Sequence, residues 1–149
     1  MSVRTNIITA LESDFATITV ANGYNNTINS VLKQSANLSQ VDASLLDLVY
    51  LVSLPASQVP GETSMWEWNV GFEIYFKTSG IDSDNDGLMR AKAESYIEDV
   101  MTLFENPANS LALDGTESLY IDSIEPYDQS PSADIGIIYG LIKIKFIFP

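Results

Sequence analysis

The stretch SMWEWNVGFEIYFKTS, residues 64–79, decides the fold of this chain. Its large apolar residues occupy every second position, which is the period of a pleated strand. On one side fall Trp66, Trp68, Val70, Phe72, Ile74 and Phe76. Full burial of these six side chains corresponds to about 10–15 kcal/mol of transfer free energy. The stretch therefore predicts a central strand with one buried face that other elements must cover.

Two amphipathic segments can cover that face. Apolar residues recur at steps of three and four from Val3 to Ile18, and again from Leu88 to Phe104. This spacing places them on one side of a helix. We expect two helices, the first ending before the β-branched run that starts at Thr17 and the second closing near Asn106.

Four further stretches have the composition of strands. The first two are Thr27–Lys33 and the apolar run Leu45–Leu54. We expect Pro55 to end the second of these strands and a loop to follow up to Thr63. Near the end of the chain, Leu119–Ile124 and Gly136–Phe148 complete the set.

The resulting order is α-β-β-β-α-β-β. It predicts an α+β fold, with a mostly antiparallel sheet of about five strands and both helices on the Trp66/Phe72 face. A chain of 149 residues has the length of one domain, so we expect residues 1–149 to share a single core.

Composition excludes several classes of function. The sequence has no cysteine and no histidine, which removes thiolate chemistry, histidine-based catalytic triads and the usual zinc sites. No apolar run is long enough for a bilayer span or a signal peptide, so we expect no membrane partner. Twenty acidic and seven basic residues give a net charge of −13, which disfavours binding to nucleic acid. We expect no catalytic residues and no cofactor other than a possible calcium ion.

The loop DSDNDG, residues 82–87, resembles the start of a calcium-binding loop. Asp82, Asp84 and Asp86 alternate as ligands do in such loops, and a glycine follows at the sixth position. The twelfth position, which supplies a bidentate glutamate in a complete loop, is Ala93. Two interpretations stay open: a weak calcium site, or a solvated turn whose last aspartate caps the second helix.

The outward side of the final strand carries Tyr139, Lys143 and Lys145. This row is either a solvated strand face or a docking patch for an acidic neighbour. Leu141 lies on the same side, and an apolar residue facing away from the core indicates an interface.

Glu67 and Glu73 share the outward side of the central strand. Six residues of extended chain separate them by about 20 Å, too far for the paired-carboxylate chemistry of glycoside hydrolysis, which needs about 5–10 Å. We therefore interpret them as solvated or as interface residues.

The whole pattern resembles the tail terminator, or tail-completion, proteins of tailed bacteriophages. The likeness lies in element order and a few positions: the opening helix, the turn Gly23-Tyr24 with its strand Asn26–Lys33, Pro55 after an apolar strand, the long alternating strand, and a second helix with spaced Ala91 and Ala93. The calcium-like loop is not part of that pattern.

The resemblance implies a structural virion protein without catalytic residues, located in the tail or neck. Such proteins form a ring, typically a homohexamer, at the head-proximal end of the tail tube. They contact the tail tube protein and the head–tail connector, and DNA passes through the lumen without specific binding. Two alternatives remain at this stage: another head–tail joining component, and a calcium-dependent binding module.

Overall fold

The computed structural model describes residues 3–33, 47–61, 64–77, 86–105, 116–125, 128–129 and 135–147. Its elements follow in the order α1 (Val3–Ala16), the 3₁₀ turn η1 (Val20–Asn22), β1 (Ser30–Lys33), β2 (Leu48–Gln58), β3 (Met65–Lys77), α2 (Asp86–Glu105), β4 (Thr116–Ile124), β5 (Asp128–Gln129) and β6 (Ile135–Ile147). This confirms the predicted α+β class and element order. The 3₁₀ turn η1 and the two-residue strand β5 are additional elements.

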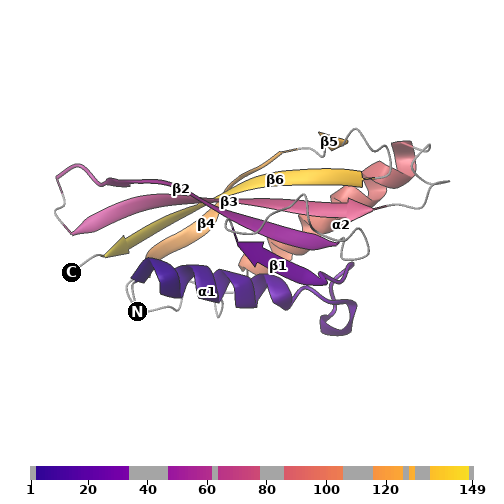
Figure 1. The fold of residues 1–149 in the computed structure, drawn as a ribbon, viewed down its shortest axis with the longest axis horizontal. Helices are drawn as coiled ribbons and strands as arrows, with labels where there is room; N and C mark the ends of the chain where they lie inside the picture. Colours follow the sequence, from indigo (N-terminus) through magenta and orange to yellow (C-terminus); the bar gives the residue numbers. More distant parts are fainter. Residues whose placement is uncertain are drawn as a thin grey trace.

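The strands form one sheet in the order β1-β2-β3-β6-β4, and β5 pairs with β6. The β1–β2 pair is parallel, and all other pairs are antiparallel. The alternating strand β3 lies in the middle, as its composition predicts, and pairs with β6 from Met65–Ile147 to Lys77–Ile135. Both helices lie on the same side of this sheet (Figure 1).

The core lies between the helices and β3. On β3, Trp68, Val70, Phe72, Ile74 and Phe76 are all buried. The helices cover them with aromatic side chains: the Phe15 ring lies 5.4 Å from that of Phe72, and Tyr96 lies 5.7 Å from Phe76. Because one face of β3 fits against both helices, the opposite face is left outside the core.

The prediction that Pro55 ends the second strand is wrong, and the connection expected from Pro55 begins only after Gln58, with a turn at Pro60 and Gly61. Residues 62 and 63 of the expected loop lie outside the described residues. β2 continues to Gln58, with a register shift between Ser53 and Ala56. A bulge places one extra residue in the strand and frees a backbone position from the ladder. Proline has no N–H to donate, so a bulge is where a strand tolerates it. β1 is also shorter than predicted, starting at Ser30 instead of Thr27.

One buried carboxylate ties the turn after η1 to α2. Asp99 is 2% exposed and accepts hydrogen bonds from the backbone N–H of Asn25 at 2.8 Å and of Asn26 at 3.0 Å. The Asn26 side-chain amide also donates to Asp99, at 3.0 Å. A charge this deep is tolerated because donors surround it.

Replacing Asp99 with alanine should destabilise the fold by roughly 1–3 kcal/mol or more, because buried N–H groups lose their acceptor. Asp99→Asn keeps the shape and one acceptor and should fall between the alanine variant and the parent. Glu98→Ala, on the exposed neighbouring position, is the control and should have little effect. Urea unfolding followed by circular dichroism measures all three, and equal losses for Glu98→Ala and Asp99→Ala would contradict this role.

Alanine substitutions at Gly140 on β6 and at Gly71 on β3 should have opposite effects on stability. A Cβ at Gly140 would overlap the ring of Phe72, its cross-strand partner. A Cβ at Gly71 would make ordinary van der Waals contacts, the nearest with Leu54 Cδ1 at 3.6 Å and with Val52 Cβ and the Val52 carbonyl oxygen at 3.8 Å. Gly140→Ala should therefore destabilise the fold by about 1–3 kcal/mol through overpacking. Gly71→Ala should be neutral or stabilising by up to about 1 kcal/mol, since glycine weakens a strand interior. Thermal melts of dilute, monomeric protein that show the same sign for both would contradict the packing described here.

Candidate interaction surface

The six residues predicted to form an interface lie together on the face of the sheet that the described helices leave uncovered. They come from the two central strands: Glu67 and Glu73 from β3, and Tyr139, Leu141, Lys143 and Lys145 from β6. Their register makes them neighbours, because Glu67 pairs with Lys145 and Glu73 pairs with Tyr139. The alternation along each strand thus brings all six to one face. The partners of these two pairs are 66 and 78 positions apart in the sequence.

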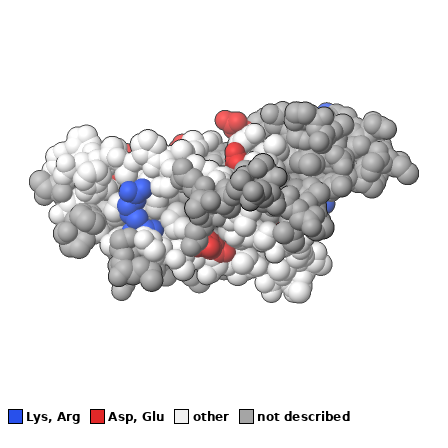
Figure 2. Space-filling model, in the orientation of Figure 1, with Lys and Arg blue, Asp and Glu red and all other residues white. Residues whose placement is uncertain are grey.

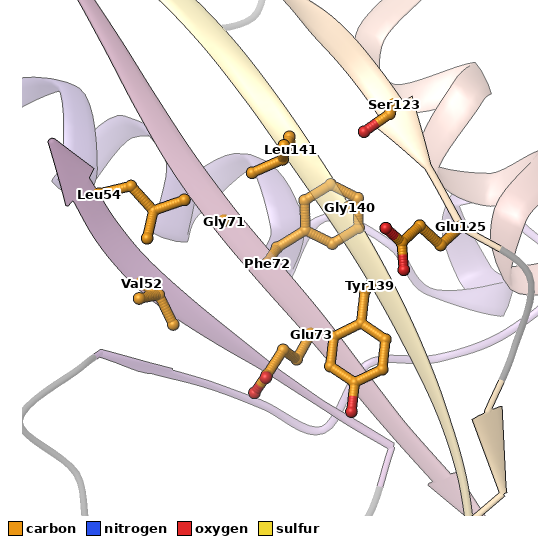
Figure 3. A pocket seen from close by; sticks show the side chains of 10 residues that line it. All are labelled: Val52, Leu54, Gly71, Phe72, Glu73, Ser123, Glu125, Tyr139, Gly140 and Leu141. Carbon is orange, nitrogen blue, oxygen red and sulfur yellow. The ribbon is translucent and has the colours of Figure 1, made fainter. Parts of the chain in front are cut away.

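A hollow of about 300 Å³ lies near the middle of this face. Gly71 has no side chain there, and its cross-strand partners are Val52 on β2 and Leu141 on β6. Leu54 and Tyr139 also line the hollow. Figure 3 shows these side chains around the space left by Gly71. The hollow exists because one position in a row of larger residues is a glycine.

Two carboxylates stand at the edge of the hollow. Figure 3 shows Glu73 and Glu125 on either side of the Tyr139 ring. The Tyr75 hydroxyl donates to Glu73 Oε2 at 2.9 Å. Burial of Tyr75 first, and then this hydrogen bond to Glu73, raise the pKa of the Tyr75 phenol well above its ordinary value. The hydrogen bond from Tyr75 holds the Glu73 carboxylate at the edge of the hollow.

The lysine end of the face is more open. Lys145 Nζ lies 3.7 Å from Glu67 Oε1, and both side chains are more than a third exposed. An exposed ion pair of this kind contributes little to stability. Ile147, the next outward residue of β6, is 43% exposed. Beyond Leu141 the face thus changes from an acid-rimmed apolar hollow to a basic row that ends in an exposed isoleucine.

The calcium-like loop, residues 82–87, lies mostly outside the described residues. Asp82 and Asp84 lie outside the described residues, and Asp86 is the first residue of α2. Across the described ranges, no three His, Cys, Asp or Glu side chains group together in a way that could hold a metal ion. Calcium binding at residues 82–87 stays a prediction from the sequence.

Sequence reasoning missed the hollow and two structural carboxylates. Gly71 interrupts the outward row of β3, and a glycine within a strand is a known signal for close approach or a gap. Asp47, with φ of 69°, accepts a hydrogen bond from the Tyr96 hydroxyl and pairs with Lys92 Nζ at 3.4 Å. No local sequence pattern indicates the structural role of Asp47 or Asp99, because the residues that they contact lie far away in the sequence.

No helix in the described part of the chain is both long enough and apolar enough to span a membrane.

Comparison with known proteins gives a likeness in structure alone. No family model matches the sequence, and no curated protein matches it. Among solved structures, the fold is similar to that of a chain in the structure described as "Virion of native gene transfer agent (GTA) particle". The match has a TM-score of 0.55 at 12% sequence identity, and it covers 95% of this chain and 92% of the other. This chain therefore has a fold that also occurs in a protein of a gene transfer agent virion.

Proposed function

We propose that this chain is a structural protein of a tailed-phage or phage-like virion. In this proposal it forms a closed ring at the head-proximal end of the tail, where it ends the tail tube and joins it to the head connector. The observation that carries the proposal is the sheet face opposite the described helices, which presents an apolar hollow beside a charged row. The fold of a gene transfer agent virion chain, matched over 95% of this sequence, supports it.

Contact with other chains accounts for the composition of this face. Val52, Leu54 and Leu141 are apolar and only partly buried, and all three line the hollow. A continuous apolar patch of this kind on a sheet usually marks an interface. Glu67, Lys143 and Lys145 would border that interface, where charged residues fix the register of two partners more than they add affinity.

A ring follows if the contact joins two different surfaces of the same protein. Such a contact repeats by rotation and either closes into a ring or grows without end. We propose a hexamer, the number typical of tail terminators, with the tail tube protein and the connector as partners on the two sides of the ring.

The charge of the chain suits a passage for DNA. A net charge of −13 repels the phosphate backbone, whereas proteins that hold DNA neutralise phosphates with lysine and arginine. Figure 2 shows one face of the molecule, on which most of the described surface is uncharged, with one main group of basic side chains and several separate acidic ones. A lumen that does not hold DNA lets it pass. The proposal therefore includes no specific binding of nucleic acid and no catalytic step.

The proposal predicts that Leu141→Glu dissociates the assembly. A carboxylate in place of Leu141 would have to be desolvated beside Glu73 and Glu125, so the contact should weaken by tenfold or more, equivalent to at least about 1.4 kcal/mol. Sedimentation velocity should show a shift toward monomer, and circular dichroism should show an unchanged fold.

Met101→Glu is the matched control. Met101 is 51% exposed on α2, on the helical side of the sheet, and the substitution adds the same charge. It should leave the assembly intact. Dissociation by Met101→Glu to the same extent, or a stable oligomer in Leu141→Glu, would contradict a contact made through the sheet face.

A further inference from the structure

We propose that the hollow at Gly71 receives Val20 from a second copy of this chain, so that neighbouring subunits join by a valine inserted into the sheet face. This inference rests on the proposed ring and names the contact that builds it. Val20 and the hollow lie on different parts of the molecule, Val20 in the turn after α1 and the hollow on the sheet face opposite α1 and α2. A contact between them is heterologous and can repeat around a ring.

Val20 is the most exposed large apolar residue in the described part of the chain. Its exposed fraction is 62%, and the other exposed large apolar residues there are Met101, Tyr120 and Ile147. Tyr120 and Ile147 pair with Lys143 and Met65 on the same face as the hollow. Two copies related by a ring rotation cannot press the same flat face together, because that requires a two-fold axis. Tyr120 and Ile147 therefore cannot enter the hollow of a ring neighbour.

Charge distinguishes Val20 from Met101. Exposed acidic residues flank Met101 along α2, at Glu94, Glu98 and Glu105. They would meet Glu73 and Glu125 at the edge of the hollow, and like charges brought together are repelled. The sequence from Phe15 to Leu32, by contrast, contains no charged residue. Figure 2 shows the corner beyond the C-terminal end of α1, where η1 lies in Figure 1, without red or blue atoms. In a protein of net charge −13, this is a surface that can approach the hollow.

The turn that carries Val20 is held in place by hydrogen bonds at both ends. Val20 N–H donates to Thr27 Oγ1 at 3.0 Å, and Gly23 N–H donates to the Val20 carbonyl at 3.0 Å. Asn22 N–H donates to Thr19 Oγ1 at 3.2 Å, and the Asn22 side-chain amide donates to the Thr17 carbonyl at 2.8 Å. Asp99 then fixes the following backbone at Asn25 and Asn26.

This bonding gives Val20 the properties of a preorganised anchor. An exposed loop held so firmly loses little conformational entropy when it docks, which favours binding. The hollow offers an apolar floor of Val52, Leu54 and Leu141 and about 300 Å³ of space, enough for a branched side chain of valine size. Burial of Val20 there would remove an exposed apolar side chain and fill the gap left by Gly71.

The absence of cysteine from the sequence allows a direct test. Val20→Cys and Gly71→Cys would each introduce one thiol, and the space at Gly71 accommodates a Cβ. The two single variants are mixed, assembled and oxidised, and the products are separated on a non-reducing gel. A disulfide requires Cβ atoms within about 4.5 Å, so we expect a cross-linked dimer as the main product. The double variant should give higher cross-linked species from the same contact.

Met101→Cys mixed with Gly71→Cys is the matched control, and it should give at least tenfold less dimer. Assembled protein without a cross-link between Val20→Cys and Gly71→Cys, or an equal yield with Met101→Cys, would overturn the inference. If Leu141→Glu still dissociates the parent assembly in that case, the proposed function stands and this contact alone fails. A parent protein that stays monomeric would contradict both.

Discussion

The rest of the structure depends on one constraint, which is that both helices cover the same face of the central strand β3. The aromatic side chains of that face fit against Phe15 and Tyr96, and the main hydrophobic cluster of the described residues forms between the helices and that face. Residues one position away along β3 and β6 must then point to the other side. The interaction surface is therefore a direct consequence of strand alternation combined with a helical layer on one face.

Glycine sets the shape of both faces. On the buried side, Phe72 lies over Gly140 and Phe76 over Gly136, so two aromatic rings fill the space that side chains of β6 would otherwise take. On the outward side, the described atoms nearest to a Cβ at Gly71 belong to Leu54 and Val52 and not to a ring, and the result is a hollow. The same residue type thus allows close packing where a partner strand supplies a ring and leaves a gap where none does. We propose that another chain fills this gap.

Local pattern was enough to predict most of the fold. The period of two in β3 and the helical spacing in α1 and α2 are strong signals, and the structure places these elements within a few residues of the expected bounds. Pro55 misled the prediction because a bulge depends on pairing with β3, which the sequence of β2 alone does not reveal. The outward positions of Glu67, Leu141 and Lys145 were likewise predictable from alternation. The hollow was not, because it requires Gly71, Val52 and Leu141 from three strands to meet. Asp99 was missed for the same reason, since its partners Asn25 and Asn26 lie more than seventy positions away.

The central claim is that the sheet face opposite α1 and α2 is buried between copies of the chain in a closed ring. Native mass spectrometry of the intact protein tests it most directly, because a closed ring has one defined mass and an open assembly does not. The account predicts a single oligomer with a mass corresponding to six copies of the 16.4 kDa chain. On dilution, this oligomer should give way directly to monomers. A monomer at every concentration, or a continuous series of masses without a preferred size, would contradict it.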